Sequence, residues 1–438
     1  MWSYHPSLLE RSLPRYTSYP TAAEFMPVGG DFHEAGFDAV APDTPASLYL
    51  HIPFCEKICW YCGCNTGAVN KTRRLEAYLD ALHAEIELVA ARLGNRRPIT
   101  QIAFGGGSPN AIPAVDFVRL VDHLMIAFSA FDARLSIELD PRGLKAEWIA
   151  VLGRSGVSHA SLGVQTFDPL LQERIGRVQP FADVAHAVKE LRDHGISSLN
   201  FDLMYGLPGQ TMAELKATIV RTIDMAPDRI ALFGYAHLPA AIPRQRQIDA
   251  SDMPAPRQRF DMAALGHRMF TDAGYEPVGF DHFARPGDSL VQASREGRLK
   301  RNFQGFTDDQ AEALIGLGAS AISSFPDRYV QNDKNNGRYR MRIDAGSLAA
   351  ERGALRSASD RVVGRVIERI LCRGEADIPD PLSPDVAGQL DRMRALGLIE
   401  QVGCRVVLTE AGRPYARTLA HLFDAYHKPN EAKFSNAI

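Results

Sequence analysis

Four of the six cysteines in the sequence stand within ten residues of one another and form its clearest chemical feature. They follow the pattern Cys-x3-Cys-x2-Cys-x-Cys and are Cys55, Cys59, Cys62 and Cys64. Iron–sulfur clusters are held by thiolates on short loops of this kind, whereas structural zinc usually takes two separated ligand pairs. The run therefore favours an iron–sulfur cluster, and three thiolate ligands would leave one iron open for chemistry. The isolated Cys372 and Cys404 are expected to be buried as small apolar residues.

Polar side chains alternate with apolar ones near the carboxyl ends of four short apolar stretches. A strand that is buried on both faces should be apolar throughout, so one polar face has to be explained. Active sites of parallel barrels lie at the carboxyl ends of their strands. We therefore expect four polar residues from different strands to converge on one site, namely Tyr49, Glu138, Gln165 and Asp202.

A run of glycines at 105–107 follows another apolar stretch and is completed by Ser108. It lacks the Gly-x-Gly-x-x-Gly spacing of dinucleotide-binding folds and the lysine of phosphate-binding loops. Two interpretations remain open, a tight turn or a close approach of the backbone to a ligand.

The elements that must position these residues repeat one unit, a short apolar strand followed by a loop and an amphipathic helix. Strands are predicted at 48–52, 99–104, 135–139, 160–164, 199–203 and 229–233. The clearest helix follows the cysteines, where apolar residues recur at helical spacing from Leu75 to Leu93. Parallel strands with crossover helices predict an α/β fold. Six units suit an incomplete (β/α)6 TIM-like barrel, since eight units need about 250 residues.

The two ends of the chain have a different character. Residues 1–45 carry several prolines and no helical period, which predicts an extended N-terminal arm over the active site. The barrel is expected over 46–300 and a smaller, mainly helical C-terminal domain over 301–438. Within that domain, helices at 361–371, 386–398 and 412–426 and strands at 399–402 and 405–408 predict a winged-helix-like pattern. Its basic residues form no stripe, so packing against the barrel is favoured over nucleic-acid binding.

Composition excludes several classes of protein. The chain has 438 residues, a net charge of −3 and 45% hydrophobic residues, which is typical of a globular protein. No apolar window long enough for a membrane span and no export signal are evident. We expect a cytoplasmic monomer without nucleic-acid or membrane partners, and an anionic ligand would have to be held by a few placed groups.

The Cys-x3-Cys-x2-Cys loop directly after the first barrel strand resembles that of the radical S-adenosylmethionine superfamily. Further strings along most of the chain resemble the oxygen-independent coproporphyrinogen III oxidases of that superfamily. These strings are RYTSYPT at 15–21, LYLHIPFC at 48–55, CGCN at 62–65, FGGGSP at 104–109, DLMYGLP at 202–208, YAHLP at 235–239, DHFARP at 281–286 and RNFQG at 301–305.

The resemblance implies one 4Fe-4S cluster on Cys55, Cys59 and Cys62, together with one or two molecules of S-adenosylmethionine. Cys64 would then be close to the substrate without being a cluster ligand, and it is a catalytic candidate together with Tyr49. The positions that match the lining of the S-adenosylmethionine site are Tyr49, Tyr61, Gly106, Gly107, Ser108, Glu138, Gln165, Arg177, Asp202, Ala236 and Ile322.

The implied activity is an oxidoreductase reaction of heme biosynthesis. A 5′-deoxyadenosyl radical derived from S-adenosylmethionine would start the conversion of two propionates of coproporphyrinogen III to vinyl groups, giving protoporphyrinogen IX. The sequence names neither the reductant of the cluster nor the electron acceptor. Arg15, Arg285 and Arg301 are candidates for binding the substrate carboxylates.

Two alternatives remain from other classes of protein. A heme chaperone of the same superfamily would bind and transfer heme, but such relatives generally lack the arm and the Cys64 position. A structural zinc protein is the third interpretation.

Overall fold

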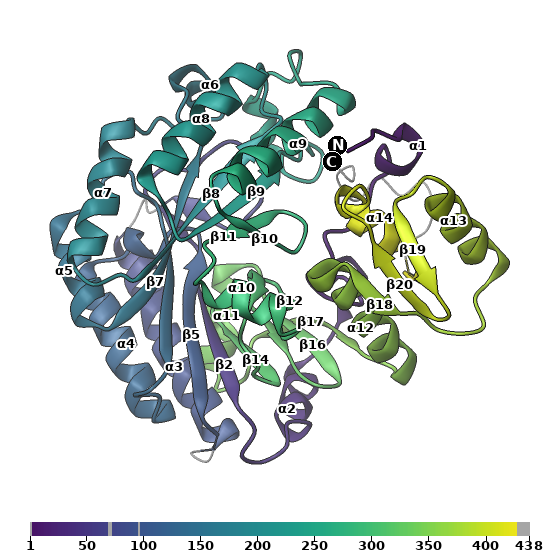
Figure 1. Cartoon of the computed structure of the whole chain (residues 1–438). Helices are drawn as coiled ribbons and strands as arrows, with labels where there is room; N and C mark the ends of the chain where they lie inside the picture. Colours follow the sequence, from purple (N-terminus) through teal and green to yellow (C-terminus); the bar gives the residue numbers. More distant parts are fainter. Residues whose placement is uncertain (1, 69–71, 95–96, 427–438) are drawn as a thin grey trace.

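The computed structural model describes residues 2–68, 72–94 and 97–426, and its centre is one large mixed sheet (Figure 1). Thirteen strands are hydrogen-bonded in the order β1-β17-β16-β15-β14-β2-β5-β6-β7-β8-β9-β11-β10. The sheet is curved, and helices lie along its outer face (Figure 1). Its inner face is therefore free to carry a site.

The six strands expected from the apolar stretches are present and lie side by side in parallel. They are β2 (Ala46–Ile52), β5 (Ile99–Gly106), β6 (Arg134–Leu139), β7 (Val157–Gln165), β8 (Ser198–Tyr205) and β9 (Arg229–Gly234). Strand and helix alternate along the chain because each parallel pair needs a crossover connection.

The crossover helices cover the outer face of the sheet (Figure 1). The apolar side chains of that face are buried beneath them. They are α3 (Thr72–Leu93), α4 (Ala114–Phe128), α5 (Ala146–Arg154), α6 (Pro169–Arg174), α7 (Phe181–Asp193), α8 (Met212–Met225) and, after β9, α9 (Pro256–Asp272). On β2, Leu48, Leu50 and Ile52 are fully buried in this layer. Each such side chain contributes about 1.5–3 kcal/mol by leaving water, and their alternation leaves Tyr49 and His51 on the inner face.

The sheet continues beyond the six parallel strands on both sides. On one side β14 (Ala313–Leu317) lies parallel to β2, followed by the antiparallel β15 (Ile322–Ser324), β16 (Arg328–Asn332) and β17 (Ala350–Leu355). On the other side β11 (His282–Ala284) and β10 (Glu276–Val278) are antiparallel. The domain boundary predicted at residue 300 therefore falls within the chain that builds this sheet, because β14 pairs with β2 across the sequence.

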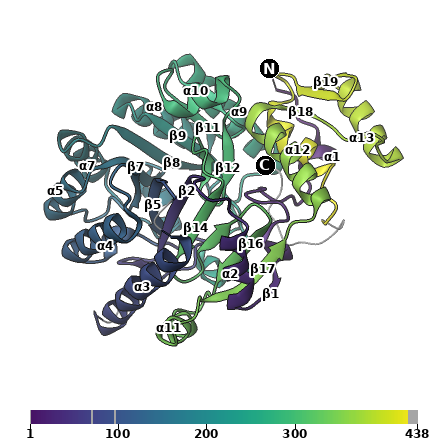
Figure 2. The ribbon, with the colours of Figure 1, turned by 90° about the horizontal axis from the view of Figure 1, so that it is seen from below.

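The N-terminal arm is not extended throughout, contrary to the prediction from its prolines. It contains the short α1 (Pro6–Leu9) and the nine-residue α2 (Gly30–Asp38), and β1 (Met26–Pro27) adds to the edge strand β17. Helix α2 packs beside β16 and β17 (Figure 2). Gly36 allows α2 to lie against Phe325 in the turn between β15 and β16, since a Cβ at Gly36 would lie 2.6 Å from that ring.

The C-terminal layer lies beside the sheet with the arm between them (Figure 1). It contains α12 (Ala358–Arg373), β18 (Glu375–Asp377), α13 (Pro384–Ala395), β19 (Ile399–Val402) and β20 (Arg405–Leu408), with the strands in the order β18-β20-β19. The last predicted helix is shorter than expected. A 3-10 turn at Arg413–Tyr415 precedes α14 (Ala416–His421). After α14 the backbone hydrogen bonds run from residue i to residue i−3, which ends the α-helix.

The remaining cysteines differ from each other. Cys372 is buried as expected, but Cys404 is exposed, because it lies in the tight turn between β19 and β20. In the described part of the chain, no helix combines the length and apolarity that a membrane crossing requires.

Candidate functional site

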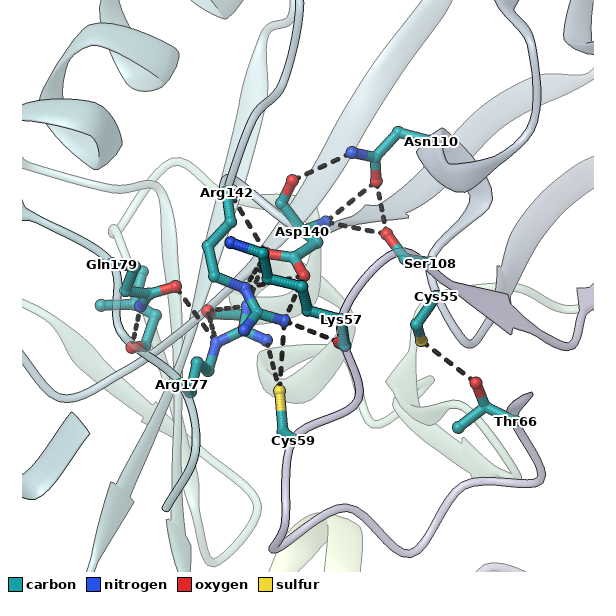
Figure 3. A network of polar contacts seen from close by, with 12 residues as sticks. Cys55, Lys57, Cys59, Thr66, Ser108, Asn110, Asp140, Arg142, Arg177 and Gln179 are labelled. Atoms are coloured by element: carbon teal, nitrogen blue, oxygen red, sulfur yellow. Dashed lines mark hydrogen bonds and ion pairs between the residues drawn. The ribbon is translucent and has the colours of Figure 1, made fainter. Parts of the chain in front are cut away.

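The cysteine loop starts where β2 ends and is held at both ends by backbone hydrogen bonds. Its first residues form β3 (Phe54–Cys55), which pairs with β4 (Gly67–Ala68). All four cysteines of the loop are free thiols. Cys55 is buried, which raises the pKa of its thiol to about 11, and its Sγ lies 3.1 Å from the hydroxyl of Thr66 (Figure 3).

Two guanidinium groups point toward the sulfur of Cys59 (Figure 3). Arg142 and Arg177 donate hydrogen bonds to its Sγ over 3.2 and 3.1 Å. Asp140 accepts from both arginines and fixes their orientation, with contacts of 2.6 Å to Arg142 and 3.2 Å to Arg177. Burial opposes the ionisation of Asp140, but Arg177 and Arg142 hold the pKa of its carboxyl below the ordinary value. Two guanidinium groups therefore contact the sulfur of Cys59 and are held there by one carboxylate.

Cys62 and Cys64 face each other across Gly63. The amide of Cys64 donates to the Sγ of Cys62 over 3.4 Å. The hydrogen bond between the two side chains lowers the pKa of Cys62 to about 6 and raises that of Cys64. This hydrogen bond therefore favours ionisation of Cys62 over ionisation of Cys64.

These thiols fit an iron–sulfur cluster better than a single ion. Four free cysteines of one short loop are available, and two arginines contact one of them, Cys59. Among the described residues, no three His, Cys, Asp or Glu side chains come together as a site for one metal ion.

The glycine run joins the cysteine loop to the inner face of the sheet. Gly106 has a φ of +113°, and a Cβ there would lie 2.7 Å from the ring of His51. At Gly107 a Cβ would lie 2.4 Å from the carbonyl oxygen of Phe54. The amides of Gly107 and Ser108 donate to the carbonyls of Ile52 and Phe54, each over 2.8 Å. The backbone of the glycine run therefore lies in close contact with the cysteine loop.

Tyr49, Glu138 and Asp202 all lie on the inner face of the sheet. Gly105 separates Tyr49 from Glu138, and a Cβ there would meet both side chains within 3.0 Å. Glu138 accepts a hydrogen bond from the amide of Gly106 over 3.2 Å. Its depth in the fold and the charge of Asp202 raise the pKa of Glu138 to about 7. Asp202 is held by Ser161 and Asn200, which donate to it over 3.0 and 2.8 Å.

Gln165 and Arg177 meet above the end of β7. Gln165 has a φ of +64°, a left-handed conformation that costs energy for a residue with a side chain. Arg177 donates to the carbonyl of Gly163 over 3.0 Å from Nε. A Cβ at Gly163 would lie 2.9 Å from Arg177 and 3.1 Å from Gln165. The glycine therefore permits both side chains to reach the site.

Tyr61 and Ala236 are linked by a buried glutamine. The side-chain amide of Gln245 donates to the carbonyl of Tyr61 over 2.9 Å and to that of Ala236 over 3.0 Å. Ile322 lies on the other side, where its backbone packs against Gly316, the partner of Tyr49 in the β14–β2 pairing. The fold thus brings the residues singled out in the sequence to the carboxyl ends of the parallel strands and to the loops beyond them.

Several residues that build this region were missed in the sequence. Asp140 lies on the same face of its segment as Ser136 and Glu138, so its polar pattern was a usable signal. Arg142 and Gln245 gave no signal, because their partners lie on distant loops.

Known proteins are similar to this chain over nearly its full length. Residues 49–221 match the Radical SAM superfamily. A curated protein of Bradyrhizobium diazoefficiens named oxygen-independent coproporphyrinogen III oxidase is 41% identical, over 98% of each chain. A protein of the same name from Salmonella typhimurium is 37% identical, over 97% of this chain and 96% of its own. The solved structure of coproporphyrinogen III oxidase HemN from Escherichia coli, described as a radical SAM enzyme, has a TM-score of 0.90 and 35% identity, covering 97% of this chain and 100% of that one.

Proposed function

This chain belongs to the family of oxygen-independent coproporphyrinogen III oxidases, and from that premise we propose how its residues perform the reaction. It is a radical S-adenosylmethionine oxidoreductase of heme biosynthesis. Each of two propionates of coproporphyrinogen III becomes a vinyl group by losing one hydrogen atom, one electron and carbon dioxide. An unactivated C–H bond has no acid–base route, so the hydrogen acceptor has to come from a cofactor.

Cys55, Cys59 and Cys62 hold the 4Fe-4S cluster in this proposal. The support is the set of free thiols on one loop and the arginine pair at Cys59. Arg142 and Arg177 balance negative charge at the cluster side of the loop. When bound, the cluster and S-adenosylmethionine supply the one-electron chemistry.

S-adenosylmethionine is held by residues that surround the cysteine loop. Glu138, Asp202 and Arg177 offer opposite charges to its ammonium and carboxylate groups, and the backbone at Gly106, Gly107 and Ser108 closes one side. Tyr61, Gln165, Ala236 and Ile322 complete the lining. Equilibrium dialysis with labelled S-adenosylmethionine measures whether one or two molecules bind at once.

Tyr49 and Cys64 are the residues that we assign to the substrate side of the site. Tyr49 lies on the inner face of the sheet next to Gly105 and Glu138. Cys64 is the exposed last cysteine of the cysteine loop. The protein's task is to orient the reacting propionate and to exclude water and oxygen.

The finer architecture follows from the same premise. We propose that β2, β5, β6, β7, β8 and β9 form an incomplete (β/α)6 barrel and that the C-terminal layer is winged-helix-like, since α12 and α13 flank its three-stranded sheet. The division into an arm (1–45), a barrel (46–300) and a C-terminal domain (301–438) is kept with one change. The second boundary moves past β17, to about residue 356, so that the sheet is not divided.

Partners and location complete the proposal. A one-electron donor reduces the cluster, a separate acceptor takes the electron released with carbon dioxide, and the enzyme acts as a monomer. A cytoplasmic location would keep the cysteines reduced.

The observation that carries this proposal is the presence of three free thiols next to the strand ends that bear Glu138 and Asp202. Anaerobic reconstitution tests the proposal. We expect iron and sulfide in about equal amounts, S-adenosylmethionine cleavage on reduction, and protoporphyrinogen with carbon dioxide from coproporphyrinogen III. Heme binding without release of carbon dioxide would instead support a heme chaperone. One zinc ion per chain and no sulfide would support a structural zinc protein.

A further inference from the structure

Four arginines gather where the N-terminal arm, the edge of the sheet and the C-terminal layer meet. This arginine cluster consists of Arg15, Arg259, Arg301 and Arg417. Arg15 and Arg417 line a cavity of about 70 Å³, whose wall also includes Phe233, Phe280 and Asp281. Arg259 and Arg301 lie behind this wall, against Gly234 and Phe280. The four arginines come from the arm, α9, the short strand β12 (Lys300–Asn302) and α14, so no local stretch of sequence contains the cluster.

Two members of the cluster hold the carboxyl end of β9. Arg15 donates from Nη2 to the carbonyl of Gly234 over 2.9 Å, with its guanidinium 5.7 Å from the ring of Phe233. Arg259 donates to the carbonyl of Tyr235 over 2.6 Å, and its Nε is buried and has no hydrogen-bond partner in the described part of the chain. The next residue is Ala236, which we assign to the cofactor site. The cavity therefore adjoins that site along the chain.

The other two members are packed more deeply. Arg301 lies between the rings of Phe280 and Phe306, 5.0 and 4.5 Å from their centres. Its Nε and Nη1 are buried without a hydrogen-bond partner among the described residues. Arg417 is buried and donates to the backbone carbonyls of Leu13 and Pro14, which ties the arm to α14.

Positive charge exceeds negative charge in this region. Among the described residues that line the cavity, Asp281 is the one carboxylate, and its direct partner is His282 at 2.7 Å. Arg15, Arg259 and Arg301 form no ion pair with any carboxylate of the described residues. Burial, and then the charge of Arg15, lower the pKa of Arg417 to about 10. Cations that repel one another in a partly buried space are stabilised when an anion binds among them.

We propose that the arginine cluster binds a propionate carboxylate of coproporphyrinogen III that the reaction leaves intact. This inference rests on the proposed function. A cavity of about 70 Å³ takes a carboxylate arm but not a tetrapyrrole ring, and arginine is the side chain best shaped for carboxylate binding. An ion pair stabilises a carboxylate against loss as neutral carbon dioxide, so these arginines suit a group that is retained.

The structure separates the three arginines singled out in the sequence. Arg15 and Arg301 belong to the cluster. Arg285 does not, because it follows β11 at the point where that strand pairs with the start of β9, and its Nη2 donates to the carbonyl of Ala226 over 2.9 Å. It lies at the amino end of β9, on the opposite side from the candidate site.

The test uses the anaerobically reconstituted holoenzyme and the variants Arg15→Gln and Arg301→Gln, with Arg285→Gln as the matched control. A charge-assisted hydrogen bond is worth about 1.5–3 kcal/mol, or about tenfold and more in affinity. We expect the KM for coproporphyrinogen III to rise about tenfold or more in both variants, while kcat falls less than about threefold. Arg301→Lys, which keeps the charge, should recover part of the loss.

Binding of coproporphyrin III, the stable oxidised form, is measured in parallel by fluorescence. Its Kd should rise about tenfold in Arg15→Gln and stay unchanged in Arg285→Gln, and the uncharged tetramethyl ester should bind weakly to every form. Arg15 is exposed, so its variant remains informative if Arg301→Gln does not fold.

Two results would overturn the inference. One is an unchanged KM and Kd in Arg15→Gln, and the other is a fall in kcat at unchanged KM, which would assign the cluster to the reacting group. If the unaltered holoenzyme itself neither binds coproporphyrin III nor releases carbon dioxide, the proposed function fails first.

Discussion

The hydroxyl of Tyr49 donates a hydrogen bond to Nδ1 of His51, 3.1 Å away, and the cysteine loop decides this direction. Nε2 of His51 lies 3.1 Å from the carbonyl oxygen of Asn65, which can only accept, so Nε2 carries the proton. Burial lowers the pKa of His51 and keeps the ring neutral. The neutral ring thus links the phenol on the inner face of the sheet to the loop that follows Cys64.

Replacing Tyr49 by phenylalanine keeps the ring and removes this donor. A neutral hydrogen bond is worth about 1 kcal/mol, so vinyl product formation should fall about fivefold or more if the phenol orients the substrate. Iron content should stay the same, because the Tyr49 side chain bonds to no cysteine. Product is measured by chromatography after anaerobic turnover. An unaltered rate would remove Tyr49 from the substrate side of the site.

The cysteines should divide into three ligands and one neighbour. Cys59→Ser is expected to lose most of the bound iron and sulfide, whereas Cys64→Ser should retain the cluster and lose product formation. The reason is that the side chain of Cys64 is exposed, whereas its backbone amide donates to the Sγ of Cys62. The serine variant keeps this amide, so Cys62 can still act as a thiolate. Iron analysis and the visible absorption of the cluster provide the measurement. If Cys64→Ser lost iron as fully as Cys59→Ser, Cys64 would have to be counted as a ligand.

Gly107→Ala should disrupt the contact between the glycine run and the cysteine loop. Its Cβ would lie 2.4 Å from the backbone oxygen of Phe54, which cannot move without shifting β3. We expect a loss of about 1–3 kcal/mol in the free energy of unfolding. Gly388→Ala is the control, because Gly388 lies in α13 with nothing within 4 Å of its Cβ, and it should gain about 0.5–1 kcal/mol. Urea denaturation of both variants decides whether the effect is specific to the loop.

Glu85 should make stability depend on pH. It is fully buried and accepts hydrogen bonds from Asn332, Tyr339 and the amide of Gly318, over 2.7, 2.7 and 2.6 Å. Burial raises its pKa from 4.5 to about 7, so between these values the folded protein keeps a proton that the unfolded chain has lost. The contribution of Glu85 to stability is therefore greatest below pH 4.5 and falls as the pH rises to about 7.

Glu85→Gln removes this titration. A pKa that rises from 4.5 to about 7 corresponds to about 3 kcal/mol, so the variant should gain about that much relative to the unaltered protein between pH 4.5 and pH 8. The free energies of unfolding of the two apoproteins are compared across this range. If the two curves of unfolding free energy against pH ran parallel, Glu85 would be ionised in the folded protein throughout this pH range.

Local patterns along the chain were enough to locate the six parallel strands and the cysteine chemistry, but not β10, β11 and β14 to β17. The alternation at Leu48–Ile52 placed Tyr49 and His51 on one face, because side chains of a strand alternate with a period of two. The helical spacing from Leu75 predicted α3 for the same kind of reason. The cysteine run indicated its cluster through spacing alone, since its members lie on one short loop.

Contacts between distant segments were decided by the tertiary structure. The pairing of β14 with β2, the arginine pair at Cys59 and the bridge from Gln245 to Tyr61 join residues that are separated by more than eighty positions. The same holds for Arg15, Arg259, Arg301 and Arg417, each of which is an ordinary cation in its own stretch of sequence. Periodicity reports only which face of an element is buried, whereas a cluster of like charges requires several elements to be packed together before the charges meet.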